Sequence, residues 1–139
     1  MNFQPIFDAA YTSISEQGAP GYDQTRGTCS YFSKDINGHE MRCAIGHLLP
    51  DQMARELGST MQCMHNLADQ INPAVAERFG LDISDNTEYW TLVGFLTRLQ
   101  TAHDEAAEVS TDEEFLSGFR REMREVAKSF ALSTEVLDR

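Results

Sequence analysis

The chain has 139 residues, 41% hydrophobic and 24% charged, which is typical of one soluble globular domain with a single core. Its 22 acidic and 11 basic residues give a net charge of −11, which argues against simple nucleic-acid binding because such binding needs lysine and arginine. The charge fits a protein that repels its own copies or meets a basic partner. No apolar run approaches the ~20 residues that span a bilayer, and the N-terminus lacks a secretory signal. We expect one cytoplasmic domain over residues 1–139, without membrane association, as a monomer or small homo-oligomer.

The N-terminal part of the chain predicts a helix followed by a loop. Apolar residues from Phe3 to Ile14 recur at helical spacing and predict a helix over residues 3–17. Residues 18–27 contain three glycines and a proline, which favours a loop.

A small β-hairpin is predicted next. Two β-capable runs, around 28–33 and 39–43, flank Asn37-Gly38, a strong turn signal. A tight two-residue turn would place Phe32 opposite Cys43 and direct Cys29 to the other face. A bulge at the turn would shift the register and could bring the two cysteines together.

The middle of the chain predicts several short helices. The run CAIGHLL, residues 43–49, is expected to start a helix that Pro50 interrupts, and residues 51–57 to continue it as far as Gly58. An amphipathic segment over 59–71 follows. Asn72 as cap and Pro73 at the first position then predict a separate short helix that ends before Gly80.

Two long helices complete the predicted fold. The first runs from about Asn86 to Ala107, and its apolar stripe includes His103. Capping boxes at Ser110 with Glu113, or Thr111 with Glu114, open the second, whose stripe extends to Phe130, and the tail could add one more turn. The predicted fold is mainly α: a single-domain helical bundle with one small β-hairpin near residues 28–43.

Cys43 lies at the expected junction of hairpin and helix. The three cysteines are an odd number, so we expect reduced thiols. A helix starting at Cys43 would favour the thiolate through its dipole, Gly46 would leave room for approach, and His47 would lie one turn on, on the same face. The alternative is a small buried cysteine, which most free cysteines are.

The segment around His103 is the second candidate for chemistry. A lone histidine on an apolar stripe is usually a core residue, but Asp104, Glu105 and Glu108 crowd a helix end where the dipole disfavours negative charge. Asp104 lies about 100° around the helix from His103, so no direct hydrogen bond between them is expected. The sequence predicts no cofactor and no metal site. Zinc remains an open alternative because of four suitable side chains: Cys29, Cys43, His47 and His103.

Three quoted stretches carry a family resemblance. CSYF…NGHEMRCAIGHLLPD, LTRLQTAHDEAA and FLSGFRREMREVAKSF, within residues 28–130, resemble a family of small uncharacterised phage, prophage and bacterial proteins. Leu49 stands where isoleucine is common, and QMARELGS after Asp51 departs from the family pattern. The family lends no established activity, but the resemblance favours the meeting of its polar motifs in one place. By this resemblance the site residues are Cys29, Tyr31, Cys43, Gly46, His47, Asp51, Gln100, His103 and Asp104.

Three functions follow as hypotheses. The first is a small acidic accessory protein of phage type that binds a host or mobile-element macromolecule. The second is a cysteine-dependent hydrolase or transferase, with Cys43 as nucleophile, His103 or His47 as base, and Asp104 or Gln100 to orient it. The third is a small-ligand binder that uses the same cleft, so the partner is a protein or a small molecule. We predict that residues 43–47 and 100–104 face one cleft. The candidate catalytic residues are Cys43, His47, His103 and Asp104, and the candidate binding residues are Cys29, Tyr31, Gly46, Asp51 and Gln100.

Overall fold

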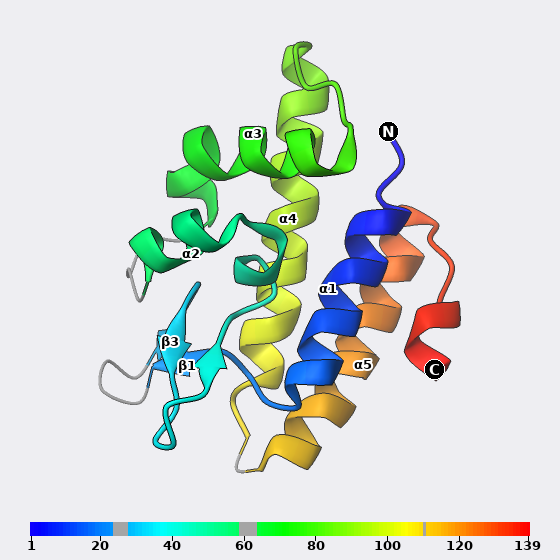
Figure 1. Cartoon of the computed structure of the whole chain (residues 1–139). Helices are drawn as coiled ribbons and strands as arrows, with labels where there is room; N and C mark the ends of the chain where they lie inside the picture. Colours follow the sequence, from blue (N-terminus) through cyan, green and yellow to red (C-terminus); the bar gives the residue numbers. More distant parts are fainter. Residues whose placement is uncertain (24–27, 59–63, 110) are drawn as a thin grey trace.

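The computed structural model describes residues 1–23, 28–58, 64–109 and 111–139. Its helices are α1 (Gln4–Gln17), α2 (Asp51–Leu57), α3 (Ala68–Phe79), α4 (Asn86–Ala106) and α5 (Asp112–Phe130) (Figure 1). The described residues also form short 3₁₀ turns: η1 (Gly46–Leu48) before α2, η2 (Met64–Leu67) before α3, and η3 (Glu135–Asp138) after α5. This arrangement confirms a mainly α single domain. No helix in the described ranges is both long and apolar enough to cross a membrane.

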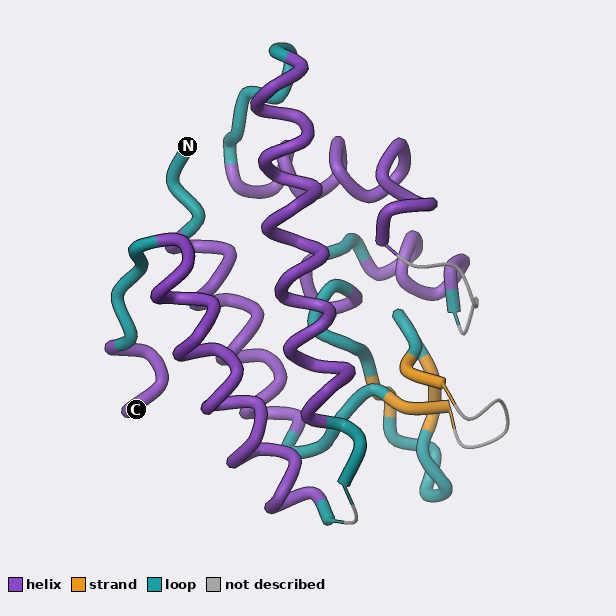
Figure 2. Tube along the Cα trace, turned by 180° about the vertical axis from the view of Figure 1, so that it is seen from behind, coloured by secondary structure: helices purple, strands orange, loops and turns teal. Residues whose placement is uncertain are grey.

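The core lies between α1, α4 and α5. Phe7 on α1, Phe95 on α4 and Phe119 on α5 are fully buried, and Phe3 stacks on Phe95 with 4.3 Å between ring centroids. α1 and α5 lie side by side on one side of α4, whereas the strands lie on the other side (Figures 1 and 2). The apolar stripes that predict the three long helices therefore face one another, and their burial stabilises the bundle.

The ends of several helices confirm the capping signals. Gly58 and Gly80 follow α2 and α3 with positive φ angles of 51° and 66°. Thr111 caps α5, and its hydroxyl accepts a hydrogen bond from the Glu114 N–H at 3.1 Å. The alternative cap at residue 110 lies outside the described residues. The tail forms the predicted extra turn, η3.

The predicted break at Pro73 is wrong. α3 runs through Pro73 without interruption, and Asn72 is a buried residue within the helix, whose side chain donates to the Tyr89 carbonyl at 3.0 Å. Proline removes only one N–H donor here, and Ile71 and Val75 are buried on either side of it. Packing of that apolar face outweighs the local cost of the proline.

The predicted hairpin exists, but with a different register. β3 (Ser33–Lys34) pairs with β4 (Glu40–Met41) in the antiparallel register Ser33↔Met41 and Lys34↔Glu40. The turn is wider than two residues, since the Asp35 N–H donates to the His39 carbonyl at 2.9 Å. This register is one residue away from the one that would place Phe32 opposite Cys43.

A second small sheet lies beside the hairpin. β1 (Tyr22–Asp23), in the predicted loop, pairs antiparallel with β2 (Thr28–Cys29), the beginning of the expected first hairpin strand. This pairing holds residues 22–23, which follow α1, next to residues 28–29. The backbone bond from the Cys43 N–H to the Ser30 carbonyl, 2.8 Å, continues this connection.

Candidate functional site

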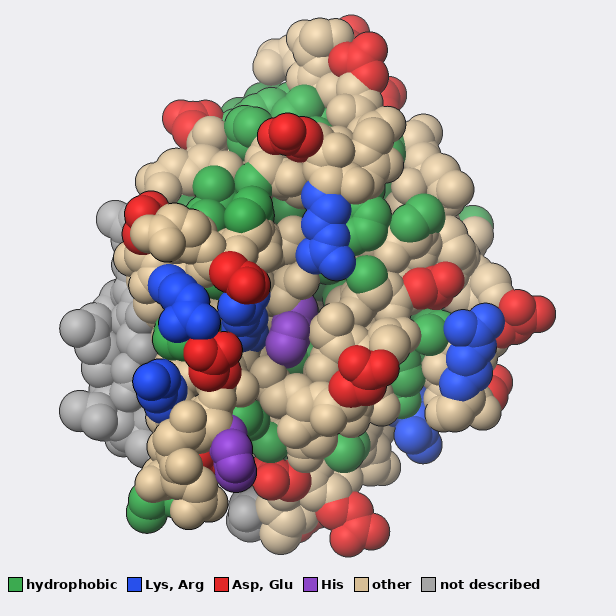
Figure 3. Space-filling model, in the orientation of Figure 1, with side chains coloured by type: hydrophobic (Ala, Val, Ile, Leu, Met, Phe, Trp, Pro, Cys, Tyr) green, Lys and Arg blue, Asp and Glu red, His purple; other side chains and the backbone are tan. Residues whose placement is uncertain are grey.

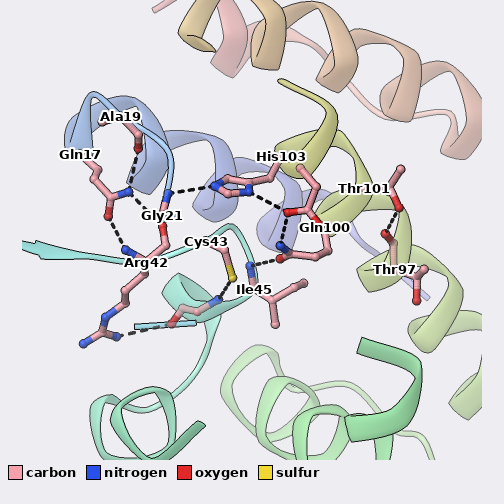
Figure 4. A network of polar contacts seen from close by, with 12 residues as sticks. Gln17, Ala19, Gly21, Arg42, Cys43, Ile45, Thr97, Gln100, Thr101 and His103 are labelled. Atoms are coloured by element: carbon pink, nitrogen blue, oxygen red, sulfur yellow. Dashed lines mark hydrogen bonds and ion pairs between the residues drawn. The ribbon is translucent and has the colours of Figure 1, made fainter. Parts of the chain in front are cut away.

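The two predicted polar segments, residues 43–47 and residues 100–104 near the C-terminal end of α4, lie in contact with each other. The Ile45 N–H donates to Gln100 Oε1 at 3.3 Å, which ties the segment before η1 to α4. Figure 4 shows Cys43, Ile45, Gln100 and His103 near one another, with Gly21, from the chain after α1, next to His103. The sequence separation between Ile45 and Gln100 is 55 residues, so only the tertiary fold joins them.

His103 forms the centre of the contacts and has no exposed surface. Its Nε2 accepts the Gly21 N–H at 3.1 Å, which assigns the ring hydrogen to Nδ1. Nδ1 then donates to Asp104 Oδ1 at 3.1 Å, and Gln100 Nε2 donates to the same oxygen at 2.8 Å. The expectation that His103 and Asp104 do not form a direct hydrogen bond is wrong. Although the two residues are about 100° apart around the helix, their side chains turn towards each other and bring Nδ1 and Oδ1 within hydrogen-bond distance.

Two glycines make this close packing possible. A Cβ atom on Gly21 would overlap the carbonyl carbon of Arg42 and the nitrogen of Cys43, both far inside 3.0 Å. A Cβ atom on Gly46 would overlap the Tyr31 carbonyl oxygen. Both positions require glycine because backbone crosses backbone there, not because of an unusual φ angle.

Cys43 is sealed within the core rather than exposed in a cleft. Its residue is 1% exposed, and its Sγ accepts the Gly46 N–H at 3.4 Å. Burial, and secondarily the Asp104 carboxylate, raise the pKa of the thiol to about 12. The predicted helix start is also wrong: only the three-residue 3₁₀ turn η1 follows Cys43, so no α-helix dipole acts on the sulfur. A buried thiol with a raised pKa has little thiolate character and little access for a reagent.

His47 is the histidine of the motif that reaches the surface. Gln17 holds it: Gln17 Oε1 accepts both the Arg42 N–H at 2.9 Å and His47 Nε2–H at 2.8 Å, while Gln17 Nε2 donates to the Arg42 carbonyl. Partial burial, and secondarily the guanidinium groups of Arg42 and Arg78, lower the pKa of His47 to about 4. His47 is therefore neutral at pH 7.

Two adjoining surface hollows share His47 and Glu40. The first, which we call the His47–Arg78 hollow, has a volume of ≈590 Å³, and its lining includes Glu40, Arg42, His47, Leu49, Asp51 and Arg78. The second, the Glu16–Asp112 hollow, has a volume of ≈490 Å³, and its lining includes Glu16, Gln17, Asp35, His39, His47 and Asp112. Figure 3 shows this face, where blue and red side chains interleave around a purple one near the centre of the view.

The structure divides the predicted site residues into two groups. Tyr31 and Gly46 join Cys43 and His103 in the interior, whereas Asp51 lies at the surface and its Oδ1 accepts a hydrogen bond from Arg42 Nη2 at 2.9 Å. The side chain of Cys29 lies outside the described part, so the zinc alternative that includes it stays open. Among the described residues, no group of three metal-ligating side chains is present.

Sequence reasoning missed two residues that shape the surface. Gln17 is the last residue of α1 and carries no motif, yet it clamps Arg42 and His47. Arg78 lies in the last turn of α3, and its NH1 donates to the His47 carbonyl at 2.8 Å. An arginine near a helix C-terminus is common, so no sequence signal marks Arg78 as part of a site.

Comparison with known proteins leaves the site to be interpreted from its own chemistry. No protein-family model, curated protein sequence or solved structure matches the chain.

A pH titration of His47 tests the lowered pKa of its ring and the position of the ring hydrogen. In a pH titration by NMR, the His47 ring is expected to titrate near pH 4 and to carry its hydrogen on Nε2. The unfolded chain binds a proton here near pH 6.5, so stability is complete above that value and decreases as the pH falls towards 4. His47→Gln, which titrates in neither state, is expected to lose less stability over this interval. A His47 ring that titrates near pH 6.5 contradicts its partial burial beside the two guanidinium groups.

Proposed function

We propose that this protein is a small acidic accessory protein of the phage type, which acts by binding a macromolecular partner, and that the contact surface surrounds His47. The observation that carries the proposal is the division of the motif residues. Cys43 and His103 lie in the interior and hold three chain segments together, whereas His47, Arg42 and Asp51 from the same stretch line a surface hollow. The buried motif residues thus stabilise the backbone that carries the surface motif residues.

The alternative of a cysteine-dependent enzyme has less support. A nucleophilic cysteine needs a lowered pKa and access for the substrate, and Cys43 has a pKa near 12 and 1% exposure. The Nε2 of His103, which would take the proton from the thiol, already accepts the Gly21 N–H. Both groups are committed to contacts within the fold.

An apolar tip beside the hollows also supports binding. Ile36 is 97% exposed at the turn between β3 and β4, and its neighbour Asp35 lines the Glu16–Asp112 hollow. Asp35 Oδ1 accepts the N–H groups of Asn37 and His39 at 2.8 and 2.9 Å, so the turn that presents Ile36 is held rigidly. A turn held in this way would lower the entropy cost of a contact made by Ile36.

A capture experiment with matched variants tests this function. The tagged protein, Arg78→Glu and the control Arg124→Glu are each incubated with a bacterial lysate, and bound proteins are quantified by mass spectrometry. Arg124 lies on α5 and pairs with Asp138 at 2.8 Å, away from the hollow. We expect a partner that the wild type and Arg124→Glu retain and Arg78→Glu loses, with at least ~tenfold weaker binding when the purified partner is titrated.

Two outcomes contradict the proposal. The first is that every captured protein binds Arg78→Glu as well as it binds the wild type. The second is that the purified partner does not bind the purified wild-type chain directly. Folding of each variant is checked by circular dichroism, so that loss of binding is not confused with loss of structure.

A further inference from the structure

The His47–Arg78 hollow contains an arginine, Arg78, that forms no ion pair with the carboxylates of the described residues. Within the described residues, no carboxylate pairs with Arg78, although the chain holds 22 acidic residues against 11 basic ones. By contrast, Arg42 pairs with Asp51 at 2.9 Å and Arg55 with Glu40 at 2.8 Å. A cation left unpaired in an acidic chain is available to a ligand.

Arg78 is held in place for this role. Its NH1 donates to the His47 carbonyl at 2.8 Å, and its guanidinium lies over the Phe79 ring, 5.0 Å from the centroid. These contacts reduce the side-chain entropy that binding would otherwise cost. The remaining N–H groups of its guanidinium fork are available to a planar anion.

A second guanidinium lies beside the first. Arg42 lines the same hollow, and its NH1 is 3.5 Å from the Gly46 carbonyl, whereas Arg78 binds the carbonyl of the next residue, His47. The two cations are therefore held at adjacent points of one backbone turn. His47 between them stays neutral at pH 7 because partial burial and the two guanidinium groups lower its pKa, so it does not supply a third positive charge.

Asp51 already occupies part of this site. Its carboxylate accepts from Arg42 NH2 at 2.9 Å, while its side chain is 80% exposed. The Arg42 side chain is only 12% exposed, but the Asp51 side of the pair is open to solvent, so an incoming carboxylate can replace Asp51 at Arg42. The exposure of Asp51 also shows that the rim is open to a group carried by a large molecule.

We propose that the His47–Arg78 hollow binds a carboxylate of the protein partner between Arg78 and Arg42, in competition with Asp51. A carboxylate matches the planar fork of arginine and carries a single charge. Two arginines face two carboxylates, Glu40 and Asp51, in the lining, and the whole chain carries −11, so a dianionic phosphate or a polyanion is repelled more strongly. This inference rests on the proposed function and names the chemical group that the surface recognises.

The first test uses acetate as the probe. Acetate is titrated into the ¹⁵N-labelled protein at constant ionic strength, with chloride as the reference salt, and the N–H signals of Gly46, His47 and the arginine side chains are followed. We expect saturable shifts at these signals, weakened at least ~fivefold in Arg78→Gln because the second cation is lost. Acetate that gives no saturable shifts overturns the inference, and so does inorganic phosphate that binds more tightly than acetate.

The second test concerns the competition with Asp51. Asp51→Asn removes the internal carboxylate and is expected to tighten acetate binding ~threefold or more. Asp138→Asn is the matched control because it neutralises the acid of a similar arginine pair, Arg124–Asp138, outside the hollow. Equal acetate affinities in Asp51→Asn and the wild type contradict the competition.

The two proposals fail separately. If acetate does not bind but Arg78→Glu still loses the captured partner, the binding function stands and the carboxylate assignment falls. If acetate binds as expected but the partner binds Arg78→Glu as tightly as the wild type, the hollow is an anion site that the partner does not use. The proposed function is then contradicted together with the assignment of the carboxylate to the partner.

Discussion

Replacing Gly21 with alanine is expected to lower the free energy of unfolding by ~3 kcal/mol or more, which is enough to unfold a marginally stable domain. The new Cβ would overlap backbone atoms of Arg42 and Cys43, and backbone cannot move aside as a flexible side chain can. Displacing Gly21 to relieve the overlap would also take its N–H away from His103 Nε2, now 3.1 Å distant. A buried donor and a buried acceptor would then both lack a partner.

Gly94→Ala provides the matched control. Gly94 lies within α4 on its exposed side, and an added Cβ meets nothing within 4 Å. The same substitution there is expected to stabilise the protein by up to ~1 kcal/mol because alanine favours helix more than glycine does. Denaturant unfolding followed by circular dichroism measures both values. Wild-type stability in Gly21→Ala means that the chain after α1 does not cross residues 42–43 as described.

The second large effect concerns the reactivity of the Cys43 thiol. In a chain with Cys29→Ser and Cys63→Ser, iodoacetamide at pH 7.5 is expected to label Cys43 at least ~100-fold more slowly in the folded state than in guanidinium chloride. The rise of the pKa from 9.0 to about 12 lowers the thiolate fraction, and burial adds a steric barrier. Labelling is quantified by mass spectrometry of the intact protein.

The sign of this effect separates the two main hypotheses. A nucleophilic cysteine would react faster in the folded protein than in the denatured one, since the fold would lower its pKa. Rapid labelling of native Cys43 would therefore support the cysteine-dependent enzyme and contradict a structural role. A thermal unfolding curve, measured on a separate sample of the double variant, confirms that the protein is folded under the labelling conditions.

Much of the fold could be predicted because long helices carry their own signals. The apolar stripes of α1, α4 and α5 repeat over several turns, and most of the residues on them are buried in the core. Short elements depend on packing instead. Pro73 is a strong local break, yet the burial of Ile71 and Val75 overrides it, and Asn37-Gly38 predicts a turn but not its width.

Less of the candidate site could be predicted. The resemblance and the unusual acidic helix end indicate that residues 43–47 and 100–104 belong together, and the Ile45–Gln100 hydrogen bond joins them. The sequence does not reveal that their meeting point is sealed, because burial of Cys43 depends on the chain that crosses at Gly21. Arg78 and Gln17 carry no pattern at all, since their roles come only from tertiary contacts.

The central claim is that the buried motif residues maintain the fold while the surface around His47 binds. Titration calorimetry of the captured partner against Cys43→Ser and Arg78→Glu tests it most directly. Serine retains an acceptor for the Gly46 N–H, so Cys43→Ser is expected to bind within ~twofold of the wild type, whereas Arg78→Glu binds at least ~tenfold more weakly. A folded Cys43→Ser variant that loses the partner, beside an Arg78→Glu variant that keeps it, would contradict the account.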